Sequence, residues 1–139
     1  MDSLIDVRKI AKRSSDFRRV IATGARSQLV LMTLAPGEEI GSEVHPETDQ
    51  ILFVLDGEGR AVVAGRERDV EENDVVFVPA GTEHNLVNSD DDEDLKIVTV
   101  YAPPEYAEGT VHPTKADAMA AERLEKKVPA APGVGTTVS

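Results

Sequence analysis

The stretch Gly37-Glu-Glu-Ile-Gly-Ser-Glu-Val-His-Pro-Glu-Thr-Asp-Gln-Ile-Leu-Phe-Val-Leu-Asp-Gly57 decides the fold that we expect for this chain. Glu43 and His45 are two residues apart, so in an extended strand their side chains leave the same face. Gln50 opens an aliphatic run in which alternate residues share its face. A polar group on the core face of a sheet costs free energy unless it is satisfied. The stretch therefore predicts two β strands that carry a polar site on their inner side.

A second stretch, Asn73-Asp-Val-Val-Phe-Val-Pro-Ala-Gly-Thr-Glu-His-Asn-Leu-Val-Asn88, has a similar build, because an aliphatic run is followed by a turn and a histidine. Pro79 presets φ and Gly81 permits a tight turn, which brings His84 to the start of the next strand. The two stretches together supply four nitrogen or oxygen donors. A divalent metal would satisfy such a cluster, and we interpret the stretches as the two halves of one metal site.

Short runs of β-branched and aliphatic residues separated by turn residues continue through most of the chain. The pattern predicts eight strands, at residues 17–23, 27–35, 50–55, 60–64, 67–70, 75–78, 84–88 and 95–101. Such spacing is typical of an all-β sandwich or small barrel. The second and third of these runs are apolar on both faces, so we expect a cover outside the barrel. We expect a homodimer to provide it, with the N-terminal arm alone as the alternative.

The chain is expected to be one domain with a segment at each end. Residues 1–16 form a loose arm or short helix, residues 17–103 the barrel, and residues 104–139 a C-terminal segment. Pro103 and Pro104 cannot continue a strand because proline lacks the ladder donor. Thr114 and the acidic residue three positions later predict a helix at about 115–127, followed by a disordered tail.

Composition excludes several classes of function. Without any cysteine among its 139 residues, the chain has no disulfide, thiolate zinc site, iron–sulfur cluster or thiol nucleophile. A net charge of −11 repels nucleic acid and anionic membranes, which are not expected as partners. There is no signal peptide pattern and no run of membrane-spanning length, so a cytoplasmic location is expected. Phosphate-binding glycine loops, nucleophile elbows and dinucleotide fingerprints are also missing.

The first stretch resembles the first motif of the cupin superfamily. That motif reads Gly, five residues, His-x-His, four residues, Glu, six residues, Gly, and it aligns with Gly37, Glu43, His45, Gln50 and Gly57. Two positions depart from it, because Glu43 stands in the place of the first histidine and Gln50 in the place of the glutamate.

The second stretch resembles the second cupin motif, from Asn73 in the place of its opening glycine through Pro79, Gly81 and His84 to Asn88. Fifteen residues separate the two motifs, as in small single-domain microbial cupins of the cupin 2 type that are likened to mannose-6-phosphate isomerase. The resemblance implies an all-β fold, the cupin double-stranded β-helix or jelly-roll barrel, with an N-terminal arm and a short C-terminal helix.

The resemblance also implies a metal site held by Glu43, His45, Gln50 and His84. Cupins that cyclise unsaturated uronic acids use glutamine in the position of Gln50. Two imidazoles, a carboxylate and an amide suit iron(II), and they also accept manganese, nickel or zinc. The alternative is a cupin that has lost its metal and hydrogen-bonds these groups to water or a ligand.

A metal-dependent, isomerase-type reaction on a small sugar or organic acid is the first functional hypothesis, with the metal as a Lewis acid. Glu47, two residues beyond His45, and His112, in a Gly-Thr-Val-His stretch after the barrel, are the candidates for moving a proton. For His112 this requires the C-terminal segment to fold over the barrel mouth. The other hypotheses are a non-catalytic module that binds a small ligand and a non-haem iron dioxygenase.

Overall fold

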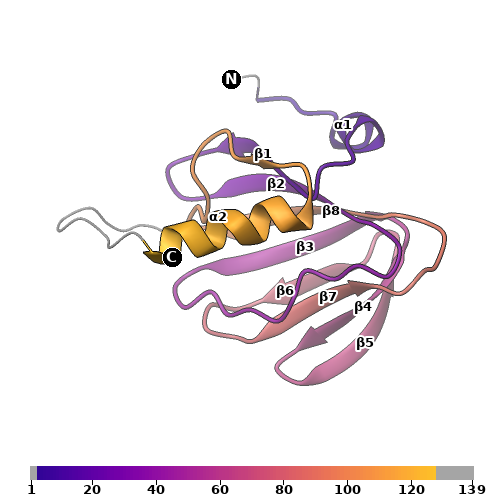
Figure 1. Ribbon diagram of the computed structural model, residues 1–139. Coiled ribbons are helices and arrows are strands. Elements are labelled where there is room, and N and C mark those ends of the chain that lie inside the picture. The colour runs from indigo at the N-terminus through magenta and orange to yellow at the C-terminus, as the bar shows by residue number, and fades with distance from the viewer. Residues whose placement is uncertain (1–2, 128–139) are drawn as a thin grey trace.

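The computed structural model describes residues 3–127, and its strands form two antiparallel sheets (Figure 1). The strands are β1 (Arg18–Thr23), β2 (Gln28–Leu34), β3 (Asp49–Asp56), β4 (Glu58–Val63), β5 (Arg66–Glu71), β6 (Val75–Val78), β7 (His84–Asn88), β8 (Leu95–Ala102) and β9 (Val111–His112). The helices are α1 (Val7–Arg13) and α2 (Lys115–Lys127). The larger sheet has the order β6-β3-β8-β2-β1-β9 and the smaller one β5-β4-β7. This is the predicted double-stranded β-helix with a C-terminal helix.

All eight predicted strands are present, with ends that differ from the prediction by one or two residues at most. The turn between β4 and β5 uses Ala64 at φ 52° and Gly65 at φ 78°, the two positive values that a tight hairpin turn needs. Asn73, between β5 and β6, has a φ of 74°. Asparagine adopts this left-handed conformation more easily than most other residues, so the turn follows directly from local sequence.

Strand β9 is an element that the sequence did not indicate. It pairs with β1 through Arg18 opposite His112 and Arg19 opposite Val111. The chain therefore returns, after Pro103, to the free edge of the larger sheet instead of leaving the barrel. A strand of two residues has no alternation to detect, which is why only the folded structure reveals it.

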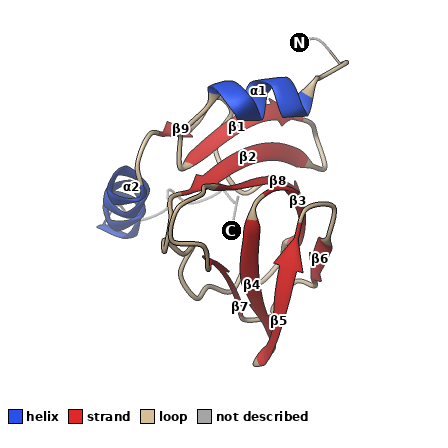
Figure 2. Cartoon of the chain, turned by 90° about the vertical axis from the view of Figure 1, so that its right-hand side faces the viewer, coloured by secondary structure: helices blue, strands red, loops and turns tan. Residues whose placement is uncertain are grey.

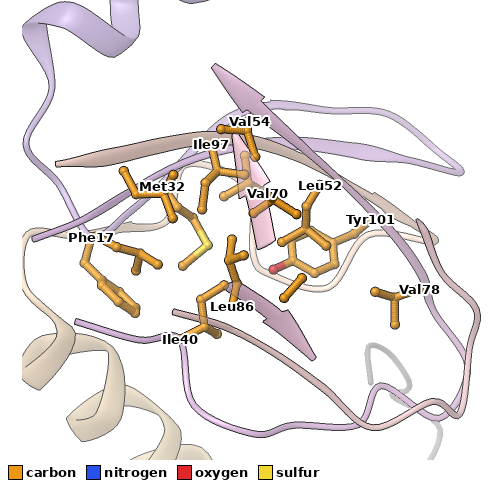
Figure 3. Packing of buried hydrophobic residues seen from close by; sticks show 14 of the residues in the cluster. Phe17, Met32, Ile40, Leu52, Val54, Val70, Val78, Leu86, Ile97 and Tyr101 are labelled. Atoms are coloured by element: carbon orange, nitrogen blue, oxygen red, sulfur yellow. The ribbon is translucent and has the colours of Figure 1, made fainter. Parts of the chain in front are cut away.

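The hydrophobic core lies between the two sheets (Figure 3). Met32 and Ile97 from the larger sheet meet Leu86 and Val70 from the smaller one, and all four side chains are buried. Each fully buried aliphatic side chain contributes about 1.5–3 kcal/mol relative to an exposed one. The core thus holds both sheets rigidly around the polar groups on their inner faces.

Helix α1 packs on the outer face of the larger sheet, as Figure 2 shows. The Asp6 side chain caps it by accepting a hydrogen bond from the Lys9 backbone N–H at 3.1 Å. Ala11 of the helix packs against Leu31 of β2 and Leu55 of β3. The arm therefore supplies a cover for the strands that are apolar on both faces, while the homodimer stays a prediction.

Helix α2 begins at a reciprocal cap. The Asp117 backbone N–H donates to Thr114 Oγ1 at 3.1 Å, and the Thr114 N–H donates to Asp117 Oδ2 at 3.1 Å. Ala118 anchors the helix in the core. Within residues 3–127, no helix is both long enough and apolar enough to cross a membrane. The tail predicted to be disordered, beyond the helix, lies outside the described residues.

Candidate metal centre

Glu43 is positioned by a single β bridge with His84. The Glu43 N–H donates to the His84 carbonyl, and the His84 N–H to the Glu43 carbonyl, both at 3.0 Å. The regular strand that the sequence predicted around Glu43 is therefore reduced to this bridge. Gly41, at φ 101°, and Pro46, which lacks an N–H, interrupt further pairing. Residues directly opposite each other have adjacent side chains, so the bridge places the two groups together.

The side chains of Glu43, His45 and His84 converge at one point. Glu43 Oε1 lies 3.2 Å from His45 Nε2 and 3.6 Å from His84 Nε2. One potential ligand atom from each residue lies within 4.8 Å of the others. Both imidazoles are buried, with exposed fractions of 7% for His45 and 3% for His84. Three donors at this spacing form a site that could hold a metal ion.

Hydrogen bonds at the Nδ1 atoms fix the orientation of both histidine rings. His84 Nδ1 lies 3.0 Å from the Thr82 carbonyl, and His45 Nδ1 lies 3.0 Å from Glu105 Oε1. A carbonyl or carboxylate oxygen only accepts, so each Nδ1 must carry the proton. In the neutral ring Nε2 then presents its lone pair to the site. Imidazoles that bind metals in proteins are commonly held in this way.

Glu105 is a site residue that sequence reasoning missed. It comes from the loop after β8 and also accepts a hydrogen bond from Thr48 Oγ1 at 3.2 Å. The Gln28 side chain accepts from the Glu105 backbone N–H at 3.1 Å and fixes this loop. Glu105 follows His45 by sixty residues, so no local spacing connects them. The one available signal was an acidic residue directly after the Pro-Pro stop of the last barrel strand.

Gln50 lies fully inside the barrel on β3. Its amide nitrogen donates to Thr99 Oγ1 at 3.1 Å and to Tyr101 OH at 3.2 Å. Its Oε1 and the Nε2 of His84 are buried and have no hydrogen-bond partner within the described residues. An unsatisfied buried polar atom costs about 1–3 kcal/mol. Both atoms could donate a lone pair to a divalent cation, so the donor set fits a metal.

Burial and hydrogen bonding shift the pKa values of Glu43 and His45 in opposite directions. Burial opposes the charge on Glu43, yet the hydrogen bonds and charges of His45 and His84 lower the pKa of its carboxyl to about 2. Burial also opposes the charge on His45, but its hydrogen bonds to Glu105 and Glu43 raise the pKa of the ring to about 9. Without a metal, the carboxylate and a protonated His45 therefore neutralise each other.

The two residues predicted to move a proton lie away from these three side chains. Glu47 is exposed, and within residues 3–127 no hydrogen bond or ion pair connects it to the site. His112 is half-buried on β9, where its Nδ1 lies 3.3 Å from Nη1 of Arg18. The segment after the barrel does return to the site, but Glu105 rather than His112 contacts a histidine there.

Aromatic rings line the path between His112 and the metal centre. Ring centroids are 6.4 Å apart from His112 to Tyr106, 5.5 Å from Tyr106 to Tyr101 and 5.6 Å from Tyr101 to His45. Arg18 lies over the Tyr106 ring, with Cζ 4.5 Å from its centroid. Sequence reasoning missed Arg18 as well, although a charged residue near the start of a predicted strand, directly after Phe17 and on the same face as Val20, was a visible signal.

Comparison with known proteins identifies the family to which this fold belongs. The family described as "Cupin domain" matches residues 30–101. An uncharacterised Bacillus subtilis protein, YrkC, is 40% identical over 126 residues, which span 86% of this chain and 67% of YrkC. An uncharacterised protein of Acanthamoeba polyphaga mimivirus, L612, is 35% identical over 112 residues, which span 78% of this chain and 69% of L612.

Among solved structures, BH2720 from Bacillus halodurans superposes with a TM-score of 0.82 at 38% sequence identity. The match covers 86% of this chain and 95% of BH2720. The similarity thus extends beyond the two motifs to the arm or the C-terminal segment. With its two sheets, its two motifs and the family match over most of the barrel, the chain belongs to the cupin family.

Proposed function

We propose that the chain is a metal-binding cupin that acts on a small sugar or organic acid. The observation that carries the proposal is the convergence of Glu43, His45 and His84, with one ligand atom of each within 4.8 Å of the others. Gln50 is proposed as the fourth ligand through Oε1, because both donors of its amide are already used within the barrel. A divalent cation held there supplies Lewis-acid polarisation of a carbonyl or hydroxyl oxygen.

The protein's own residues prepare the site for such a ligand. Glu105 and the Thr82 carbonyl hold the two rings with Nε2 inward, so little reorganisation is needed when a metal binds. One carboxylate among the four donors leaves a net positive charge on a bound divalent ion, which favours an oxygen ligand with negative charge. Of the two candidates for proton transfer, His112 is the one connected to the interior, through Arg18 and Tyr106.

Metal analysis of the purified protein tests the proposal. We expect close to one equivalent of a transition metal, and an increase in melting temperature when iron(II), manganese, nickel or zinc is added to the stripped protein. At a metal concentration of about 100 times Kd the stabilisation is about 2.7 kcal/mol. Replacing Glu43 by Ala should abolish both effects, whereas Glu47→Gln, an exposed carboxylate nearby, should change neither.

The proposal fails if the protein carries less than about a tenth of an equivalent of metal and added metals do not stabilise it. Full metal loading without turnover of any sugar or organic acid would instead favour the non-catalytic ligand-binding alternative.

A dioxygenase is the second candidate, favoured by the two histidines and one carboxylate of the cluster, a set that suits non-haem iron(II). It predicts oxygen uptake by protein that has been loaded with iron(II) under anaerobic conditions and then mixed with substrate and oxygen. An isomerase-type enzyme would work equally well with zinc or manganese and without oxygen.

A further inference from the structure

Arg18 is a buried cation inside the barrel. On β1 it lies directly opposite Met32 of β2, so both side chains leave the same face of the larger sheet. Met32 belongs to the core that Figure 3 shows between the sheets. The exposed fraction of Arg18 is 2%. Its guanidinium group is therefore withdrawn from solvent, which is rare for an arginine without a paired acid.

Arg18 has no carboxylate partner among the described residues. The ion pairs of the other described arginines join Arg8 to Glu72, Arg19 to Asp16 and Arg60 to Glu67, and none includes Arg18. Within residues 3–127, its one side-chain hydrogen bond joins Nη1 to His112 Nδ1 at 3.3 Å. Its Nε is buried and has no hydrogen-bond partner in the same part of the chain. A guanidinium has five N–H donors, so most of this donor capacity is not used.

Two of the unused donors form one edge of the guanidinium plane. Nε–H and one Nη2–H point in the same direction, and this side-on edge matches the two oxygens of a carboxylate or phosphate. His112 occupies Nη1, on the opposite side. The Tyr106 ring covers one face of the plane, with Cζ 4.5 Å from the ring centroid. The group is thus held in place, while no described residue pairs with its bidentate edge.

The charge of Glu43, one of the proposed metal ligands, acts on the Arg18 guanidinium. Burial opposes its charge, but Tyr106, Tyr101 and Glu43 raise the pKa of the Arg18 guanidinium above its usual value, so it remains a cation. Tyr101 packs with its ring centroid 5.6 Å from that of His45. Tyr106 packs against Tyr101 on its other side, at 5.5 Å. Arg18 and His45 are therefore linked through two tyrosine rings in contact, Tyr106 and Tyr101.

We propose that the side-on edge of Arg18 binds the anionic group of a small ligand, a carboxylate or a phosphate, inside the barrel. The ligand then carries a carboxylate or a phosphate, as an organic acid, an acidic sugar or a phosphorylated sugar does. The anion site itself needs only Arg18 and Tyr106. The statement that the bound anion is the substrate rests on the proposed function.

Binding of small probes to the full chain tests this inference. Tyr106 covers the guanidinium, so the probes are small: oxalate for a carboxylate, inorganic phosphate for a phosphate, and erythritol as a neutral control, all at one ionic strength set with sodium chloride. Melting temperature and calorimetry are measured on protein stripped of metal and on protein loaded with zinc. We expect oxalate or phosphate to bind in both forms, and erythritol in neither.

Two variants of Arg18 and one of its neighbour identify the contact. Arg18→Met keeps the length of the side chain but removes the charge, and it should weaken anion binding by about 10- to 100-fold, the value of a hydrogen bond to a charged group. Arg18→Lys keeps the charge but lacks the bidentate edge. Its affinity for the anions should lie between those of the unchanged protein and of Arg18→Met. Arg19→Met, on the exposed side of the same strand, should bind the anions as the unchanged protein does.

The inference is overturned if Arg18→Met binds the anions with unchanged affinity, or if erythritol binds as well as they do. Urea unfolding shows whether Arg18 has a purely structural role. If it has, Arg18→Met should lower the urea midpoint of the ligand-free protein. We expect that midpoint to stay the same or rise, since the substitution removes unsatisfied buried donors. If Arg18→Met does not fold, Arg18→Lys is the deciding variant. The contact is refuted if Arg18→Lys binds the anions as tightly as the unchanged protein does.

The failure of this inference can be distinguished from failure of the proposed function. Metal content is measured on the same samples. If anions bind through Arg18 but no sample binds metal, the metal-dependent function is wrong and the anion site stands. If metal binds normally but Arg18→Met leaves anion binding unchanged, only the anion site is wrong.

Discussion

Metal binding at this centre is expected to compete with a proton on His45. The ring touches two carboxylates, Glu43 Oε1 at 3.2 Å and Glu105 Oε1 at 3.0 Å, and these raise its pKa to about 9. At pH 7 about 99% of the rings then carry the extra proton. A metal requires the neutral ring, so each unit of pH between about 7 and 9 should raise the apparent association constant about tenfold.

A histidine with the ordinary pKa of about 6.5 would behave differently, because its affinity for metal would be almost constant above pH 7. The carboxyl of Glu43, with its pKa lowered to about 2, does not titrate in this range. The slope of the logarithm of affinity against pH therefore reports on His45.

Calorimetric titration of the stripped protein with zinc, between about pH 7 and 8.5 and with a competing chelator, measures this slope. Repeating the titration in buffers of different ionisation enthalpy counts the protons that are released. We expect about one proton per metal ion near pH 7.5.

Glu105→Gln tests the structural origin of the effect. The amide keeps the shape of the side chain but removes one of the two carboxylates at His45, so the slope should become flatter. Affinity above the titration range should also fall by about 10- to 100-fold, as for other residues that orient a metal ligand. Glu47→Gln, which removes an exposed carboxylate of the same charge, should keep the original slope. A flat profile in the unchanged protein, or an unchanged slope in Glu105→Gln, would refute the reasoning.

Three further predictions concern stability and assembly. Gly57→Ala should lower the free energy of unfolding in urea by more than about 2 kcal/mol, because Gly57 has a φ of 98° and an added Cβ would lie 2.6 Å from the Asp94 carbonyl oxygen. Gly65 has a φ of 78° but open space around it, so Gly65→Ala should cost about 1 kcal/mol. The raised pKa of His45 stabilises the metal-free protein fully below about pH 6.5, and about 3 kcal/mol should be lost as pH rises through about 9. Light scattering should give twice the chain mass of 15.0 kDa if the expected homodimer forms, and a monomer mass would refute it.

The barrel was predictable because its signals are local. Alternating aliphatic residues and turns such as the one at Ala64 and Gly65 give both the strands and their breaks. The spacing of Glu43 and His45 likewise placed two donors on one side. Their meeting with His84 followed from the resemblance to a family, although the regular strand expected around Glu43 is a single bridge in the structure.

The remaining parts of the site depend on contacts between distant residues. Glu105 reaches His45 only because the loop after β8 folds back and is fixed by Gln28. Arg18 and His112 are ninety-four residues apart and meet through the register of β1 with β9. No period or motif encodes such a register, and it was the register that placed His112 beside Arg18 instead of beside the metal donors.

The shared cupin region, residues 30–101, includes all four proposed metal donors but neither Arg18 nor Glu105. Glu105, which orients His45, and Arg18, which we propose to bind a ligand, therefore come from the two flanks, and β1 and β9 join these flanks at one sheet edge. If both proposals hold, the common region carries the metal donors and the flanks carry the contact that selects the ligand. Two cupins could then share every metal donor and still take different ligands, so assigning a substrate within this family requires the flanking segments to be compared first.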